Sequence, residues 1–426
     1  MKSIVACITV ALFSAVLLEW GTGGRPASAG AAAAVSGPAV LDEWGNRITM
    51  LGVSVGENSL RTQIRTAIAQ LAMFDAVNAA LDGRYHEFAS KPASPPGASA
   101  EAAAIRAAYI VALNEFPTRE AMIQSAYDAS IAALDASHEA IADGVAVGEA
   151  AAHAVLDLRA GDHRNALDLY GYTPGSGPGV WSPTPPAFGP PQTPFVRFVT
   201  PFGYDDPARF RPPAPPALDS KTYTADYNES KDVGRLNDTS RTAEQSVTAM
   251  FWSPSATALW TANIRSLTAS MDLLTAARFE AIGIAAVTNA LIACWDAKYT
   301  YQFWRPVTAI RAGDTDGNSA TEADPTWTPF LTTPSHPEYP AAHTTVGAGA
   351  LGFYTVWFDN DQFDLAFTGA GGVVRHYGSA SEIFAEEGNA RVWGGMHWRN
   401  STEVGTAVGS KVGKYTATHL LKPLDE

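Results

Sequence analysis

Three short clusters in the sequence combine positively charged side chains with histidines. The first, WDAKYTYQFWRP, holds Lys298 and Arg305 seven residues apart. This spacing equals two helical turns and would put both cations on one face of a helix that continues that far. The second, HPEYPAAH, ends in His343, and the third, ARVWGGMHW, holds Arg391 and His397. A lysine, two arginines and two histidines are suited to binding a tetrahedral oxyanion, and nothing in these clusters suits a soft metal cation.

The second cluster predicts the start of a helix at Pro340, because proline is favoured at the first helical position. The amides of Ala341, Ala342 and His343 would then lack acceptors within the helix and could bind an anion. His343 could exchange a proton with a group bound there. The alternative is a histidine that is merely hydrogen-bonded within the core.

The surroundings of the clusters favour a buried site. On an exposed helix Lys298 and Arg305 would be ordinary surface charges, but a buried, aromatic segment requires an anion to balance them. Gly394 and Gly395 offer a bend that lets Arg391 and His397, which are six residues apart, both point inward. The aromatic residues around the first cluster are Trp295, Tyr299, Tyr301, Phe303 and Trp304.

Two other patterns do not carry function. Gly347, Gly349 and Gly352 spell G-x-G-x-x-G, but they lie in an alanine-rich helical segment with no strand before it, so close helix packing is expected in place of a dinucleotide site. The segment DTDGNSATEAD (314–324) has its glycine too early for a calcium loop and is interpreted as an Asp-Gly turn, with weak cation binding as the alternative.

The elements that must position these clusters are predicted to be helical. Apolar residues recur at helical spacing in several alanine-rich segments, and no series of strands is evident, so the sequence predicts an all-α fold. Only residues 48–56 are expected to be extended. The predicted helical segments are 59–81, 101–116, 119–136, 138–160, 241–252, 257–274 and a long one from about 276 to 304.

Residues 173–217 are rich in proline and glycine and interrupt the helical pattern. Because aromatic residues usually pack, we expect an ordered strap lying on the helices, with a flexible linker as the alternative. The predicted division is a helical bundle at 30–172, the strap, and a second bundle at 218–426 that carries the anion site. The aromatic residues in question are Trp181, Phe188, Phe195, Phe198 and Phe202.

Composition limits the classes of partner. The chain has 426 residues, of which 46% are hydrophobic and 17% charged, so it can bury a large core. The net charge of −14 argues against nucleic acid or an anionic membrane as the partner.

The N-terminus resembles a secretory signal. An apolar run at 4–18 is followed by the A-x-A site Ala27-Ser28-Ala29, so residues 1–29 are predicted to be removed from a secreted or periplasmic protein. An uncleaved membrane anchor is the alternative. Cys294 would be the only cysteine of the mature chain, which excludes an intramolecular disulfide. No further stretch is expected to span a membrane.

The pattern K-x6-R-P, P-x-x-H and R-x5-H resembles that of the vanadium-dependent haloperoxidases and the related type 2 phosphatidic acid phosphatases. The resemblance implies two packed four-helix bundles with bound vanadate. His397 would bind the vanadium, His343 would be the acid–base residue, and Lys298 would polarise the bound peroxide. The groups that would hold the oxygens of vanadate are Lys298, Arg305, Arg391 and the amide of Ala342.

The resemblance implies hydrogen peroxide, a halide and a small organic acceptor as substrates, without haem, flavin or nicotinamide, and it leaves homo-oligomers open. The runner-up is an exported phosphohydrolase in which His397 attacks phosphorus to form a phospho-histidine and His343 protonates the leaving alcohol. A third alternative is an anion-binding helical protein without catalysis. The lack of membrane spans and the form of HPEYPAAH favour the peroxidase.

Two positions depart from the family pattern. Ala341 replaces a common serine, whose hydrogen bond to an anion would be worth about 1.5–3 kcal/mol. Ser401 stands where an aspartate often follows the last histidine, which leaves Glu403 as the candidate that orients the ring of His397.

Two residues would form the halide and peroxide environment, Trp295 and His336. At the position of His336 the family tends to have phenylalanine when chloride is oxidised and histidine when bromide is preferred. The resemblance therefore implies oxidation of bromide and iodide with little oxidation of chloride. The alternative is that His336 only occupies a turn and faces solvent.

Overall fold

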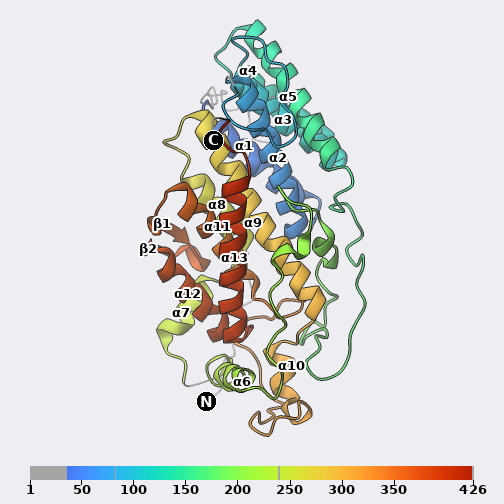
Figure 1. Cartoon of the computed structure of the whole chain (residues 1–426), viewed down its shortest axis with the longest axis vertical. Helices are drawn as coiled ribbons and strands as arrows, with labels where there is room; N and C mark the ends of the chain where they lie inside the picture. Colours follow the sequence, from blue (N-terminus) through green and yellow to red (C-terminus); the bar gives the residue numbers. More distant parts are fainter. Residues whose placement is uncertain (1–35, 82, 238–239, 425–426) are drawn as a thin grey trace, which may run out of the picture. The chain divides into compact units, whose positions relative to one another are not determined.

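The computed structural model describes residues 36–81, 83–237 and 240–424, which belong to one compact unit (Figure 1). The predicted signal peptide at 1–29, with its cleavage site, lies outside the described residues.

The described chain is mainly helical, as predicted. Of the segments expected to form helices, the long one at 276–304 is confirmed as α9, although it ends three residues earlier than expected. The helices in the described ranges are α1 (Ala39–Ser54), α2 (Ser59–Ala80), α3 (Ala100–Glu115), α4 (Glu120–Ala132), α5 (His138–Leu158), α6 (Lys221–Val233), α7 (Ala243–Phe251), α8 (Ala256–Ser266), α9 (Leu273–Tyr301), α10 (Pro306–Arg311), α11 (Ala342–Trp357), α12 (Ala380–Trp393) and α13 (Arg399–His419).

Residues 48–56 are not extended as expected. Most of them form the end of α1, because Trp44, Ile48 and Leu51 recur at helical spacing and are all buried. Val55 and Gly56 close the helix, and Gly56 has a positive φ of 67°.

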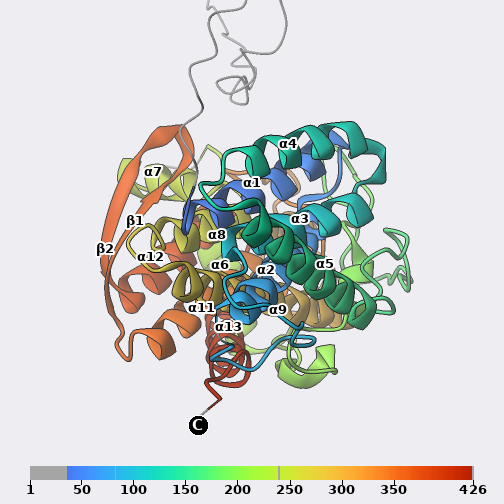
Figure 2. The ribbon, with the colours of Figure 1, turned by 90° about the horizontal axis from the view of Figure 1, so that it is seen from above.

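An antiparallel hairpin of β1 (Gln362–Thr368) and β2 (Val374–Ser379) was not predicted. Its inward residues Leu365, Phe367 and Tyr377 are buried, and the ring of Phe367 lies 5.6 Å from that of Trp252. Figure 2 places the hairpin at the edge of the fold beside α12, far from the helices α3 to α5.

Helix α9 is the centre of the core. It packs against α2, α8, α11 and α13, and Figure 1 shows α9, α11 and α13 running side by side. Contrary to the sequence-based expectation, α9 is long and apolar enough to cross a membrane by length and composition. However, 94% of its most apolar window is buried inside the protein, as in the core helix of a water-soluble fold.

The glycines of α11 allow this close packing. A Cβ atom added to Gly349 would lie 2.7 Å from Ala290 Cβ on α9, and one added to Gly352 would lie 2.7 Å from the carbonyl oxygen of Ser410 on α13. The packing interpretation of G-x-G-x-x-G is therefore confirmed. The Asp-Gly turn is confirmed as well, since Gly317 has a φ of 76°.

The segment 173–217 packs as a strap against α9. Trp181, Phe195 and Phe202 are buried, whereas Phe188 is 64% exposed and does not pack as expected. Arg211 of the strap forms an ion pair with Asp296 of α9, with 2.6 Å between Nη2 and Oδ1. The strap therefore reaches the part of α9 that carries the first cluster.

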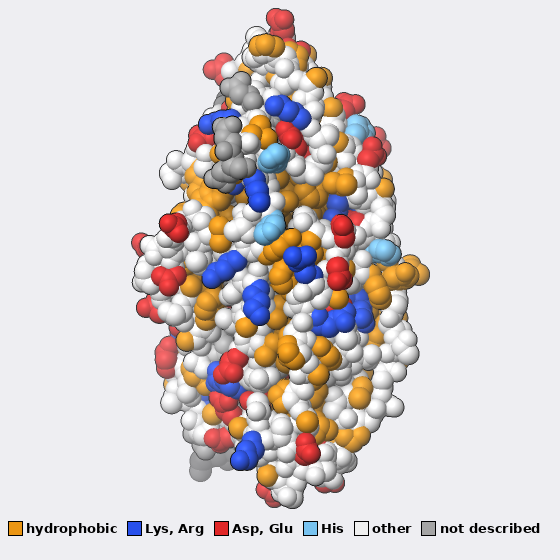
Figure 3. All heavy atoms as spheres, in the orientation of Figure 1, with side chains coloured by type: hydrophobic (Ala, Val, Ile, Leu, Met, Phe, Trp, Pro, Cys, Tyr) orange, Lys and Arg blue, Asp and Glu red, His pale blue; other side chains and the backbone are white. Residues whose placement is uncertain are grey.

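The surface carries charges of both signs. On the face drawn in Figure 3, acidic and basic side chains are mixed among hydrophobic and neutral ones. The mixed charges on this face agree with the net negative charge of the chain, which argues against nucleic acid as the partner.

Candidate active site

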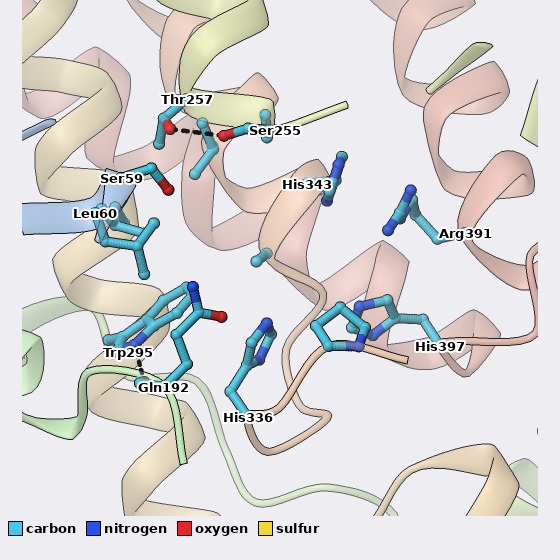
Figure 4. Close-up of a pocket in the computed structure, with 15 residues that line it drawn as sticks. Ser59, Leu60, Gln192, Ser255, Thr257, Trp295, His336, His343, Arg391 and His397 are labelled. Atoms are coloured by element: carbon cyan, nitrogen blue, oxygen red, sulfur yellow. Dashed lines mark hydrogen bonds between the residues drawn. The ribbon is translucent and has the colours of Figure 1, made fainter. Parts of the chain in front are cut away.

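The three clusters meet at one cavity of about 180 Å³. Figure 4 shows side chains from different elements surrounding a common space. The predicted site residues that line it are Trp295, His336, Ala342, His343, Arg391 and His397. Lys298 and Arg305 are fully buried next to these residues, as the contacts below show.

The first cluster reaches the site differently from the prediction. Helix α9 ends at Tyr301 because Gln302 adopts a left-handed conformation (φ 46°, ψ 42°), so Arg305 is not on the helical face of Lys298. Arg305 instead precedes α10 in an extended conformation. The reversal of the chain brings its guanidinium back toward the histidines.

Lys298 is completely buried in the last turn of α9. Its Nζ donates hydrogen bonds to the carbonyl oxygens of Pro337, at 2.8 Å, and Glu338, at 2.7 Å. Burial lowers the pKa of Lys298 to about 7. Neutral carbonyl oxygens thus hold the side chain, and a bound anion would stabilise its charged form.

Arg305 connects three parts of the site. Its Nε donates to the carbonyl oxygen of His336 at 2.9 Å, and its Nη1 donates to that of Met396 at 2.9 Å. Nη1 also lies 3.1 Å from His397 Nε2, and Nη2 lies 3.0 Å from His336 Nδ1. Burial lowers the pKa of Arg305 to about 10.

Arg391 extends from α12 into the cavity. Its Nη1 donates to the carbonyl oxygen of Trp252 at 2.9 Å, and its Nη2 lies 3.6 Å from Met396 Sδ. Its buried Nε has no hydrogen-bond partner among the described residues. Burial lowers the pKa of Arg391 to about 9, although the nearby Glu387 opposes the shift.

Helix α11 begins later than predicted. Its first residue is Ala342, and Ala341 is the N-cap in an extended conformation, so Pro340 lies outside the helix. The reason is that the amide of Ala341 donates to the carbonyl oxygen of Ser401 at 3.0 Å. The amides without a backbone acceptor in the described structure are consequently those of Ala342, His343 and Thr344.

His343 lies at this helix start, partly buried, with Nε2 2.9 Å from the carbonyl oxygen of Pro254. A carbonyl can only accept, so Nε2 carries the proton and Nδ1 keeps a lone pair. Burial and the charge of Arg391 lower the pKa of His343 well below its ordinary value. The ring is therefore neutral near neutral pH and can act as a base only through its Nδ1 lone pair.

His397 is buried in the short segment between α12 and α13, two residues before α13 begins. Its Nδ1 lies 2.7 Å from Oε1 of Glu338, and its Nε2 faces Arg305. Glu403 is exposed on α13, so it was wrongly expected to orient this ring. The sequence signal that could have identified Glu338 is its place between His336 and His343 in HPEYPAAH.

His336 is only 5% exposed, so the alternative in which it faces solvent is wrong. Its ring centroid lies 4.9 Å from that of Trp295. Trp295 Nε1 donates to the carbonyl oxygen of Gln192 at 3.3 Å, and Gln192 lines the cavity from the strap. The role of the strap in closing the cavity was missed because the sequence interpretation assigned it no site residue.

The assembled groups fit a tetrahedral oxyanion. Three buried cations make no ion pair with a described carboxylate, one guanidinium nitrogen has no partner, and a helix N-terminus opens on the same cavity. No group of three or more His, Cys, Asp or Glu residues that could hold a metal ion occurs in the described ranges. These donor groups therefore suit an oxyanion whose central atom can also bind an imidazole nitrogen.

Known proteins share these features. A family model described as the second helical-bundle domain of VCPO matches residues 278–426, which include all three clusters. A vanadium chloroperoxidase of Curvularia inaequalis is 24% identical over 289 residues. That match covers 49% of this chain and 47% of the relative, so the chain spans about half the length of the curated relative it matches.

Solved structures extend the likeness over most of the chain. A bacterial vanadium-dependent iodoperoxidase has a TM-score of 0.77 and 25% identity, with 91% of this chain and 97% of that chain covered. A bacterial vanadium-dependent chloroperoxidase in its holo form has a TM-score of 0.65, with 91% and 93% covered; at 20% identity it supports the fold alone. In fold and in these three clusters, the chain is similar to the vanadium haloperoxidases.

Proposed function

We propose that the chain is a vanadate-dependent haloperoxidase that oxidises bromide or iodide with hydrogen peroxide to hypohalous acid, which then halogenates a small organic acceptor. The observation that carries the proposal is the direction of His397 Nε2. This nitrogen lies beside Arg305 at the cavity, where three buried cations make no ion pair with a described carboxylate. The relatives named as vanadium chloroperoxidase and iodoperoxidase support the reaction class.

Vanadate, when bound, would supply the Lewis-acid centre that activates hydrogen peroxide toward attack by the halide. His397 Nε2 would bind the vanadium. The groups that would hold its oxygens are Lys298, Arg305, Arg391 and the amide of Ala342.

The protein's own residues prepare the reaction. His343 holds a lone pair on Nδ1 at the cavity and would take up the proton that hydrogen peroxide releases on binding. Lys298 would stabilise negative charge on an oxygen atom bound at the cavity, since it is buried, donates to backbone carbonyl oxygens and makes no ion pair with a described carboxylate.

His336 is the basis for the proposed halide preference. It is buried against Trp295 and in contact with Arg305, so its imidazole is placed to hydrogen-bond a reactant at the cavity, which a phenylalanine could not do. We expect bromide and iodide turnover to exceed chloride turnover clearly in the unmodified protein, and the pH profile to shift in His336→Phe. Steady-state rates with the three halides test this, and chloride turnover equal to bromide turnover would contradict it.

The second candidate function is hydrolysis of phosphomonoesters. The observation that favours it is the Nε2 lone pair of His397, which could attack phosphorus, together with Ala341, which provides no hydroxyl to the anion site. Export through residues 1–29 remains part of the proposal for either function. Sequencing the N-terminus of the secreted protein would test it.

One experiment separates the two functions. Purified protein is assayed for bromination of a phenolic dye with hydrogen peroxide, with and without orthovanadate, and for release of phosphate from an aryl phosphate. The proposal expects bromination that depends on vanadate. Phosphate release without vanadate-dependent bromination would establish the phosphohydrolase instead.

A further inference from the structure

The carboxylate of Glu338 is completely buried between two segments of the site, and each of its oxygens accepts hydrogen bonds. Oε1 accepts from His397 Nδ1 at 2.7 Å and from the backbone amide of Trp398 at 3.0 Å. Oε2 accepts from the hydroxyl of Ser401 at 2.6 Å. These bonds fix the position of the carboxylate relative to the ring of His397.

The contacts at both edges of the His397 ring require the same tautomer. On one edge, Glu338 accepts from Nδ1, so this nitrogen carries the proton. On the other edge, Arg305 Nη1 lies 3.1 Å from Nε2, and a guanidinium can only donate. Nε2 must therefore hold the lone pair, on the edge of the ring that lies beside Arg305, and His397 lines the cavity.

Glu338 also holds a second group of the site through its backbone. Its carbonyl oxygen accepts from Lys298 Nζ at 2.7 Å. A side-chain substitution at 338 keeps this carbonyl. The contribution of the carboxylate to His397 can consequently be separated from the support given to Lys298.

We propose that Glu338 is a positioning residue that fixes the proton of His397 on Nδ1 and directs the Nε2 lone pair to the bound oxyanion. The carboxylate does so from the loop before α11, whereas Ser401 on α13 supplies only a hydroxyl to it. For vanadate in particular, the inference rests on the proposed function. Carboxylates that orient a ligating histidine typically change affinity for the metal about 10–100-fold when removed.

The first test uses the ligand-free protein, so it does not depend on vanadate. The ring nitrogens of ¹⁵N-labelled histidine are observed by NMR, and the signals of His397 are assigned by their loss in His397→Ala. We expect a protonated Nδ1 and an unprotonated Nε2 in the unmodified protein, and loss of this fixed tautomer in Glu338→Ala. An unchanged tautomer in Glu338→Ala would overturn the proposal.

The second test compares the binding of two anions by calorimetry. Glu338→Ala should weaken vanadate binding about 10–100-fold and phosphate binding much less, because only vanadium accepts the Nε2 lone pair. Glu338→Gln, which retains the shape and one acceptor, should fall between Glu338→Ala and the unmodified protein. Equal losses for both anions would indicate a merely structural role and overturn the proposal.

Two further variants serve as rescue and control. In Glu338→Ala combined with Ser401→Asp, the new carboxylate starts from a position whose Oγ lies 2.6 Å from the original one, so vanadate affinity should recover. Glu403→Ala removes an exposed carboxylate in the second turn of α13, six residues after His397, and should change the affinity for neither anion. If the unmodified protein binds vanadate but oxidises no halide, the proposed function fails, while these tests still decide the role of Glu338.

Discussion

Two groups of buried cations in this protein differ in their partners, which are carboxylates in one group and neutral atoms in the other. In the paired-arginine cluster (Arg65, Arg159 and Arg164 with Glu115 and Asp162), each guanidinium meets a carboxylate. Arg164 Nε lies 2.9 Å from Glu115 Oε1, and its Nη1 lies 2.9 Å from Asp162 Oδ1. Burial lowers the pKa of Arg164, yet Glu115 and Asp162 together raise it above its ordinary value.

At the candidate active site, Lys298, Arg305 and Arg391 are at least as deeply buried, but they bond to carbonyl oxygens, imidazole nitrogens and a sulfur. Burial therefore lowers their pKa values without full compensation. A paired cation contributes to the fold, whereas an unpaired one keeps its charge for a ligand. The lack of a carboxylate partner therefore distinguishes the site independently of any relative. The pKa directions alone do not, because burial also lowers the pKa values of Arg65 and Arg159.

The largest expected effect contrasts the two groups in stability. Arg164→Ala should lower the free energy of unfolding by about 3–5 kcal/mol, because it removes one of the two arginine partners from each of two buried carboxylates, Glu115 and Asp162. Arg391→Ala should cost less than about 2 kcal/mol, because its hydrogen bonds go to a neutral carbonyl and a sulfur. Urea unfolding of the ligand-free variants measures both, and equal losses would remove the distinction.

The next effect concerns anion binding, to which the cations of the candidate site should contribute and the paired arginines should not. Arg305→Ala, Arg391→Ala and Lys298→Ala should each weaken vanadate binding about 10–100-fold, since each loses a charge-assisted hydrogen bond of about 1.5–3 kcal/mol. His397→Ala should abolish the bond to vanadium with little loss of fold. Calorimetric titration tests all four, with Arg106→Ala, a partly exposed and paired arginine, as the control. Unchanged affinity in all four variants would refute the site.

A pH effect should follow from Lys298. Because its pKa is about 7 in the ligand-free protein, its ammonium is lost as the pH rises above 7, and binding an anion must then recover the proton. Vanadate affinity should fall by up to about tenfold per pH unit above 7 relative to Lys298→Met, which has no charge to lose. Calorimetry in buffers of different ionisation enthalpy would detect the proton uptake. Parallel pH profiles for both proteins would contradict this explanation.

The same shift has a consequence for stability. Between pH 7 and the ordinary lysine value of 10.5, the unfolded chain binds a proton that the folded protein has released. The free energy of unfolding of the ligand-free protein should therefore rise with pH across this window. In Lys298→Met, which has no ammonium to lose, this rise should be absent.

The smallest expected effect concerns Ala341. This residue is fully buried and is the N-cap of α11, so serine suits its backbone conformation. Ala341→Ser should tighten vanadate binding about tenfold, because a hydrogen bond to an anion at the lower end of its range contributes about 1.5 kcal/mol. Weaker binding in the variant would indicate that the cavity is shaped around alanine.

Much of the site could be predicted because its residue types carry the chemistry. Lys298, His343 and His397 are recognisable from spacing and order alone. Glu338 could not be assigned in this way, because its contact with His397 joins residues 59 positions apart and depends on how α11 and α13 pack.

The fold was predictable where helical periodicity was strong and less so at its ends. The end of α9 depends on a left-handed Gln302, a conformation more typical of glycine, so the sequence offered no stop before Arg305. The hairpin β1–β2 was missed because only a few inward residues alternate in each short strand.

The most direct test of the account is a calorimetric titration of orthovanadate into the ligand-free protein, its Arg391→Ala variant and its Arg164→Ala variant under folded conditions. We predict a single vanadate site for which phosphate competes. Binding at this site should be lost or strongly weakened in Arg391→Ala and retained in folded Arg164→Ala. Vanadate binding that survives in Arg391→Ala and disappears in Arg164→Ala would contradict it, because the anion would then depend on the paired cations.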